Sequence, residues 1–171
     1  TKIITMKLTR TILLLAAMLT ACSNELPSYE HLHPDQKPQE VKFDPSELPA
    51  KLKGMFEDPI WDEYSFKCLN CGTCTYVCPT CHCFDINNKI RGEVGMKMRT
   101  WDSCMFAEYT LMAGGHQPRQ GKKERVRNRF LHKLQYFNEK HDMFLCIGCG
   151  RCVAKCPVNL DITKFIKQVI G

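Results

Sequence analysis

The sequence has no apolar run long enough to cross a membrane. Its N-terminal apolar stretch, Ile12 to Leu19, is well short of the roughly 20 residues that a spanning helix needs. The chain also lacks a Gly-rich phosphate loop, a flavin-binding fingerprint and an obvious catalytic nucleophile. Its most basic stretch, residues 119–133, has none of the interleaved exposed aromatic residues that stack on bases. These absences argue against a transmembrane helix, against catalysis on a bound nucleotide and against nucleic-acid binding.

The first 45 residues are predicted to lie outside the folded domain. Lys7 and Arg10 precede the short apolar stretch, and small residues stand just before Cys22, so residues 1–22 resemble the signal peptide of a bacterial lipoprotein. In that interpretation Cys22 would carry lipid and attach the chain to a membrane; the alternative is a chance apolar helix. Residues 23–45 are rich in proline and polar groups, which predicts a flexible linker. Residues 46–171 then form the predicted domain.

What the sequence does contain is cysteine, 12 in 171 residues, far above ordinary usage. Eight of the cysteines fall into two identical runs with the spacing C-x2-C-x2-C-x3-C-P. The first run contains Cys68, Cys71, Cys74 and Cys78, and the second contains Cys146, Cys149, Cys152 and Cys156. This is the spacing by which two-cluster ferredoxins hold two [4Fe–4S] clusters.

The shape of the cluster explains the spacing. A cubane presents four irons, each needing one thiolate, and three cysteines at three-residue intervals let one tight loop reach three of them. Gly72, Gly148 and Gly150 permit the backbone dihedrals of such a loop and let amide groups approach the sulfurs. The fourth cysteine of each run ligates the other cluster. The predicted ligand sets are therefore Cys68, Cys71, Cys74 and Cys156 for one cluster, and Cys146, Cys149, Cys152 and Cys78 for the other.

Other uses of these thiols fit the pattern less well. Zinc sites use paired C-x2-C knuckles, and a disulfide framework does not explain two identical runs. Three cysteines between the runs, Cys81, Cys83 and Cys104, could form a third metal site with catalytic activity of its own. We favour the alternative that they are small buried residues lining the clusters.

The expected fold is mainly α-helical, a two-cluster domain of the α-helical ferredoxin type with a small β-hairpin. Apolar spacing predicts a helix from Ser46, with Ser46 as its cap, further helices over residues 103–113 and 119–139, and a short one over 161–170. The hairpin is predicted over residues 83–101, with a turn at Asn87–Asn88. The 67 residues between Cys78 and Cys146 are too many for a compact bacterial ferredoxin.

The segments between the runs carry a more specific resemblance. Residues 78–86 (CPTCHCFDI), 99–106 (RTWDSCMF) and 113–119 (AGGHQPR) are similar to the dicluster iron–sulfur subunits of anaerobic sulfite reductase and to the β subunits of sulfhydrogenase-type [NiFe] hydrogenases. The resemblance covers roughly residues 42–171. It implies a non-catalytic subunit that relays electrons between a flavoprotein subunit, which exchanges with NAD(P)H, and a catalytic reductase or hydrogenase subunit.

Two questions stay open at this level. The basic stretch, which contains Arg129 and Lys133, is either a docking or charge-compensating face or a plain solvated helix face. The cellular location is the second question. Cubane clusters are normally inserted in the cytoplasm, whereas a lipoprotein is exported unfolded. No twin-arginine pair signals export in the folded state. We favour a cytoplasmic domain, either free or membrane-associated, over a lipid-anchored exported redox protein.

Overall fold

The computed structural model describes residues 44–171. The predicted signal-like segment 1–22, with Cys22, and all but the last two residues of the predicted linker 23–45 lie outside the described residues. Within the described part, none of the helices has the length and apolar character that crossing a membrane requires.

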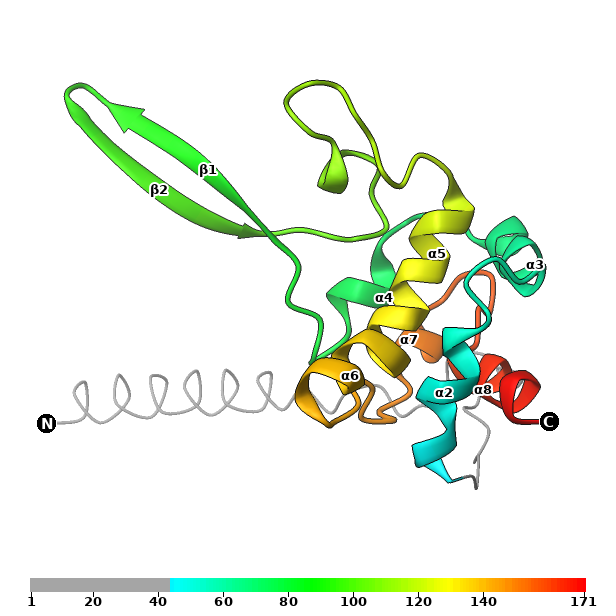
Figure 1. Cartoon of the computed structure of the whole chain (residues 1–171). Coiled ribbons are helices and arrows are strands. Elements are labelled where there is room, and N and C mark those ends of the chain that lie inside the picture. The colour runs from blue at the N-terminus through cyan, green and yellow to red at the C-terminus, as the bar shows by residue number, and fades with distance from the viewer. Residues whose placement is uncertain (1–43) are drawn as a thin grey trace, which may run out of the picture. The chain divides into compact units, whose positions relative to one another are not determined.

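Short helices and one hairpin make up the described part of the chain, and Figure 1 shows the hairpin extending away from the helices. The strands are β1 (Phe84–Arg91) and β2 (Val94–Trp101). The helices are η3 (Pro45–Glu47), α2 (Leu48–Lys53), α3 (Ile60–Lys67), α4 (Thr73–Tyr76), η4 (Glu108–Thr110), α5 (Lys122–Leu131), η5 (His132–Tyr136), α6 (Phe137–His141), α7 (Arg151–Ala154) and α8 (Ile162–Ile170). The assignment to the α-helical ferredoxin class stays a prediction.

Four aromatic rings form the centre of the core. The Phe165 ring on α8 lies 4.8 Å from that of Phe130 on α5 and 5.0 Å from that of Trp61 on α3, measured between centroids. Tyr64 packs edge-on against Phe165 at 5.5 Å. Phe165 is held in place because α8 is amphipathic and begins at Asp161, whose carboxylate accepts a hydrogen bond from Thr163 N at 2.7 Å. The predicted helix over 161–170 is therefore confirmed.

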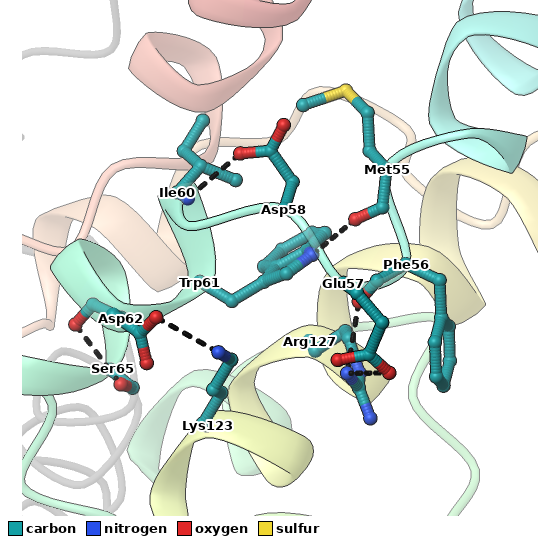
Figure 2. Close-up of polar contacts among 10 residues, drawn as sticks. All are labelled: Met55, Phe56, Glu57, Asp58, Ile60, Trp61, Asp62, Ser65, Lys123 and Arg127. Carbon is teal, nitrogen blue, oxygen red and sulfur yellow. Dashed lines mark hydrogen bonds and ion pairs between the residues drawn. The ribbon is translucent and has the colours of Figure 1, made fainter.

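Polar contacts join α3 and the loop before it to one side of α5 (Figure 2). The Trp61 ring nitrogen donates to the Met55 carbonyl at 2.6 Å. Lys123 pairs with Asp62 at 2.8 Å, and Arg127 pairs with the exposed carboxylate of Glu57 at 3.2 Å. The outer cations of α5 therefore have carboxylate partners at the surface.

The long helix predicted over 119–139 is present as a continuous run from Lys122 to His141, but its middle segment, η5, is π-helical. Val126, Phe130 and Leu134 are buried as expected, whereas Phe137 is only half-buried. The stripe thus ends one turn earlier than its spacing indicates.

The helix predicted from Ser46 is present as α2, but its predicted cap is wrong, and the helix predicted over 103–113 is wrong. Ser46 does not cap α2: it lies inside η3, and its amide donates to the Asp44 carboxylate at 2.9 Å. Residues 103–113 contain only the short η4, because side chains take the bonds that a helix would need. The Ser103 hydroxyl accepts from Met105 N at 3.2 Å and bonds the Thr75 hydroxyl at 2.7 Å, which fixes this segment against α4.

The hairpin is confirmed, but its predicted turn is misplaced. Phe84 pairs with Trp101 and Arg91 with Val94, so the two-residue turn is Gly92–Glu93. Gly92 has φ of 57°, which a glycine in the first central position of a hairpin turn adopts readily. Asn87 and Asn88 instead lie in β1, where they pair with Met98 and Lys97 of β2.

Shortening the hairpin is expected to leave the stability of the helical part unchanged. Every residue of β1 and β2 is exposed, and none of them belongs to the hydrophobic core or packs against it. Joining Asp85 to Thr100 through an Asn–Gly turn should change the free energy of unfolding by no more than about 0.5 kcal/mol in a urea titration. A loss above about 2 kcal/mol, compared with the full-length chain, would contradict this.

Candidate iron–sulfur centre

The two cysteine runs fold alike. In each, the residue before a short helix adopts a left-handed conformation: Gly72 (φ 73°) before α4 and Gly150 (φ 70°) before α7. Gly148 is also left-handed at φ 70°. The conformational role predicted for these three glycines is therefore confirmed. At Gly72 the restriction is steric as well, since a Cβ atom there would stand 2.8 Å from the Phe106 ring.

Asn70 is a position that sequence reasoning missed. It occupies the place in the first run that Gly148 occupies in the second, and its φ is 55°. Asparagine is among the few residues that tolerate this region. Its backbone amide donates to the Cys68 sulfur at 3.4 Å, one of the N–H···S contacts expected around such sites. Aligning the two runs would have revealed it.

The first predicted ligand set shares one cavity. Cys68, Cys71 and Cys74 from the first run line it together with Cys156 from the second, although that residue is far away in the chain. Leu160 N donates to the Cys156 sulfur at 3.2 Å, a second N–H···S contact. The fold thus brings a cysteine of the second run to the three-cysteine loop of the first.

Two observations relate the cysteines of the second predicted set to one another: the effects of their thiols on the pKa of Cys152, and the contacts around Cys78. Burial raises the pKa of the Cys152 thiol, Arg129 opposes this, and the thiols of Cys146, Cys78 and Cys149 raise the pKa further. Thr80, two residues beyond Cys78, donates from its hydroxyl to the Leu145 carbonyl at 2.6 Å. Because Leu145 directly precedes Cys146, this bond ties the end of the first run to the start of the second.

Four thiolates spread over four irons must stand further apart than ligands of one ion. Among residues 44–171, no three His, Cys, Asp or Glu side chains are close enough together to hold a single metal ion.

The remaining cysteines form pairs. A hydrogen bond from the Cys81 thiol lowers the pKa of Cys78 to about 3, although burial by itself would raise this pKa. A hydrogen bond from the Cys104 thiol lowers the pKa of Cys83 to about 6. Cys104 is 7% exposed, whereas Cys81 and Cys83 are half-buried. The interpretation of these three cysteines as small residues lining the clusters stays a prediction.

Because the pKa of Cys83 is low, its thiol should be alkylated at a lower pH than an ordinary cysteine. In the cluster-loaded chain, the rate of its reaction with iodoacetamide should rise with pH to a plateau, half-maximal near pH 6. Cys104→Ala removes the thiol donor and should move that midpoint up toward the ordinary value of about 8.5, whereas Cys104→Ser keeps a donor and should move it less. Peptide mass spectrometry locates the label. A midpoint unchanged in Cys104→Ala would show that the Cys104 thiol is not what lowers the pKa of Cys83.

The basic stretch is not one solvated face. Lys123 pairs with Asp62, and Arg127, itself only 12% exposed, pairs with the exposed carboxylate of Glu57, but Arg125, Arg129 and Lys133 are all buried. Lys133 donates from Nζ to the Cys78 sulfur at 3.1 Å. Arg129 lines the same cavity as the first ligand set, and its three guanidinium nitrogens have no hydrogen-bond partner in the described part of the chain. A buried cation without an anion is costly, so this guanidinium fits a site that holds a negatively charged cluster.

Comparison with known proteins agrees with this chemistry. Residues 67–160, more than half of the chain, match the model of the 4Fe-4S dicluster domain. The β subunit of sulfhydrogenase 2 from Pyrococcus furiosus is 39% identical over 115 residues, which is 67% of this chain and 34% of that protein. The chain thus spans about a third of the length of this relative. No solved structure shows a significant match.

Proposed function

Because the chain belongs to the family of 4Fe-4S dicluster domains, we propose that it is an electron-transfer subunit with two [4Fe–4S] clusters. It relays electrons between a flavoprotein subunit, which exchanges with NAD(P)H, and a catalytic reductase or hydrogenase subunit. The similarity to a sulfhydrogenase β subunit supports a place among partner subunits.

One observation carries the two-cluster proposal. The cavity lined by Cys68, Cys71, Cys74 and Cys156 combines three ligands of one run with the last cysteine of the other. A one-cluster protein has no need of a second complete run, whereas crossed ligation uses all eight thiols. When bound, each cluster accepts and releases one electron. The residues of the chain hold it and supply amide and cationic groups around its sulfurs.

Metal analysis of the full chain tests this proposal. After anaerobic reconstitution with iron and sulfide, it should hold about eight irons and about eight sulfides. Reduction with dithionite should give the electron paramagnetic resonance signals of two interacting reduced clusters. About four irons per chain, or zinc in place of iron, would overturn the two-cluster proposal.

The relay role predicts what the loaded chain does alone. Without a flavin, it should be reduced by dithionite but not by NADH or NADPH. With reduced methyl viologen it should neither evolve hydrogen nor reduce sulfite, because the catalytic centre belongs to a partner. Turnover by the isolated chain in either assay would overturn the non-catalytic assignment.

A cytoplasmic location is part of the proposal, supported by the cluster chemistry described above. The competing hypothesis is a lipid-anchored redox protein attached through Cys22. Cell fractionation with a radiolabelled fatty acid separates the two. Lipid on Cys22 would overturn the cytoplasmic assignment, and Cys22→Ser provides the matched control for the label.

A further inference from the structure

The helix formed by α5 and η5 carries three buried cations at four-residue intervals, Arg125, Arg129 and Lys133. Arg125 donates to the carbonyls of Arg119 and Gln120, whereas the other two lie nearer the cysteines. Arg129 is 2% exposed and Lys133 is 3% exposed, although most cations on helices keep their charge in water. Their spacing of four residues puts both on the same face of the helix. That face is turned toward the two cysteine sets, whereas Arg127, two residues before Arg129, pairs with Glu57 at the surface (Figure 2).

Arg129 lies near both cysteine sets. It lines the cavity of the first set, and the thiols that act most strongly on its charge are Cys74 of the first run and Cys152 of the second. No hydrogen-bond acceptor in residues 44–171 meets its guanidinium nitrogens. Its Cζ lies 5.0 Å from the centroid of the Phe130 ring, a neutral neighbour, so the negative charge that it faces is that of the thiols or of the group they hold.

Lys133 contacts Cys78, the member of the second set that comes from the first run. Its Nζ donates to the Cys78 sulfur at 3.1 Å and to the Thr80 hydroxyl at 3.4 Å. It lies in the π-helical η5, a distortion that recurs at functional sites. Its carbonyl accepts a hydrogen bond from Leu145 N at 3.1 Å, so the backbone next to Cys146 is attached to this same residue.

We propose, on the basis of the proposed function, that Arg129 and Lys133 set the reduction potentials of the two clusters. A cluster with four thiolates is an anion, and reduction adds one more negative charge. A fixed cation in a medium of low dielectric constant stabilises the reduced form more than the oxidised form, and the potential rises. Arg129 raises the potentials of both clusters, whereas Lys133 raises that of the cluster bound by Cys78.

Removing each charge tests the proposal on the loaded full-length chain. The readout is the potential of each cluster in a titration followed by electron paramagnetic resonance. Arg129→Met should lower both potentials by at least 59 mV, a tenfold weaker hold on a single electron. Lys133→Met should lower one potential by a similar amount and leave the other in place. Arg127→Met, on the same helix but paired with the Glu57 carboxylate, is the control and should shift neither potential.

Conservative replacement separates charge from shape. Arg129→Lys keeps a cation and should retain wild-type potentials or most of them. If Arg129→Met loses its clusters while Arg129→Lys keeps them, the requirement for charge is upheld. If Arg129→Lys loses them too, the role is one of packing and the proposal is overturned. Potentials of Arg129→Met and Lys133→Met equal to that of Arg127→Met would also overturn it.

The failure of this inference is distinct from failure of the proposed function. If the wild-type chain holds no [4Fe–4S] cluster after reconstitution, the proposed function itself is wrong. If it holds two clusters whose potentials do not change in Arg129→Met or Lys133→Met, only the role proposed for these two residues is wrong.

Discussion

Replacing Cys156 by serine is expected to remove the cluster whose other three ligands lie in the first run. The iron content should fall from about eight to about four per chain, because a cubane that loses a thiolate is easily lost. Cys156 lines one cavity with Cys68, Cys71 and Cys74, and this is the physical basis of the expectation. Colorimetric iron analysis and electron paramagnetic resonance of the reduced chain measure the loss.

The comparison of variants decides whether ligation is crossed. With crossed ligation, Cys156→Ser and Cys71→Ser should lose the same cluster and keep the same electron paramagnetic resonance signal. Cys78→Ser and Cys149→Ser should both lose the other cluster. Cys83→Ser is the matched control and should keep about eight irons, since Cys83 bonds Cys104 and lies outside both predicted sets. If Cys156→Ser instead matches Cys149→Ser, each run binds its own cluster and the crossed assignment is wrong.

Replacing Phe165 by alanine is expected to cause a large loss of stability. Its side chain is fully buried and contacts the rings of Trp61, Tyr64 and Phe130, which come from α3 and α5. Truncation of a buried phenylalanine costs about 3–5 kcal/mol, from lost transfer free energy and from the cavity left behind. This is a large part of the stability of a domain of this size. The free energy of unfolding in urea measures it.

Phe66→Ala is the matched control, because the Phe66 side chain is 85% exposed on α3. It should change the free energy of unfolding by no more than about 0.5 kcal/mol. If the two alanine variants were equally stable, the aromatic cluster would not be the core of the domain. A concentration-dependent difference would instead indicate that Phe66 is covered in an oligomer.

Local patterns predicted the elements whose formation depends on neighbouring residues. The helix α8 follows from its amphipathic spacing and from Asp161 at its start. The hairpin follows from alternating residues, but the position of its turn does not, because Asn87–Asn88 and Gly92–Glu93 both suit a turn. Residues 103–113 have the spacing of a helix but do not form one. The Ser103 hydroxyl bonds instead to Thr75, which is remote in the chain and therefore invisible to a local pattern.

By itself the sequence determined the chemistry of this protein. The spacing of the cysteines is a local property, set by how far one tight loop can reach around a cubane, and it is readable without a fold. Only the tertiary structure decided what surrounds those thiols. Whether a cation in the basic stretch is solvated, paired like Arg127 or buried like Arg129 depends on which helix face meets the cysteine loops. Burial of these cations comes from contacts between distant segments, which the spacing of apolar residues along one helix does not reveal.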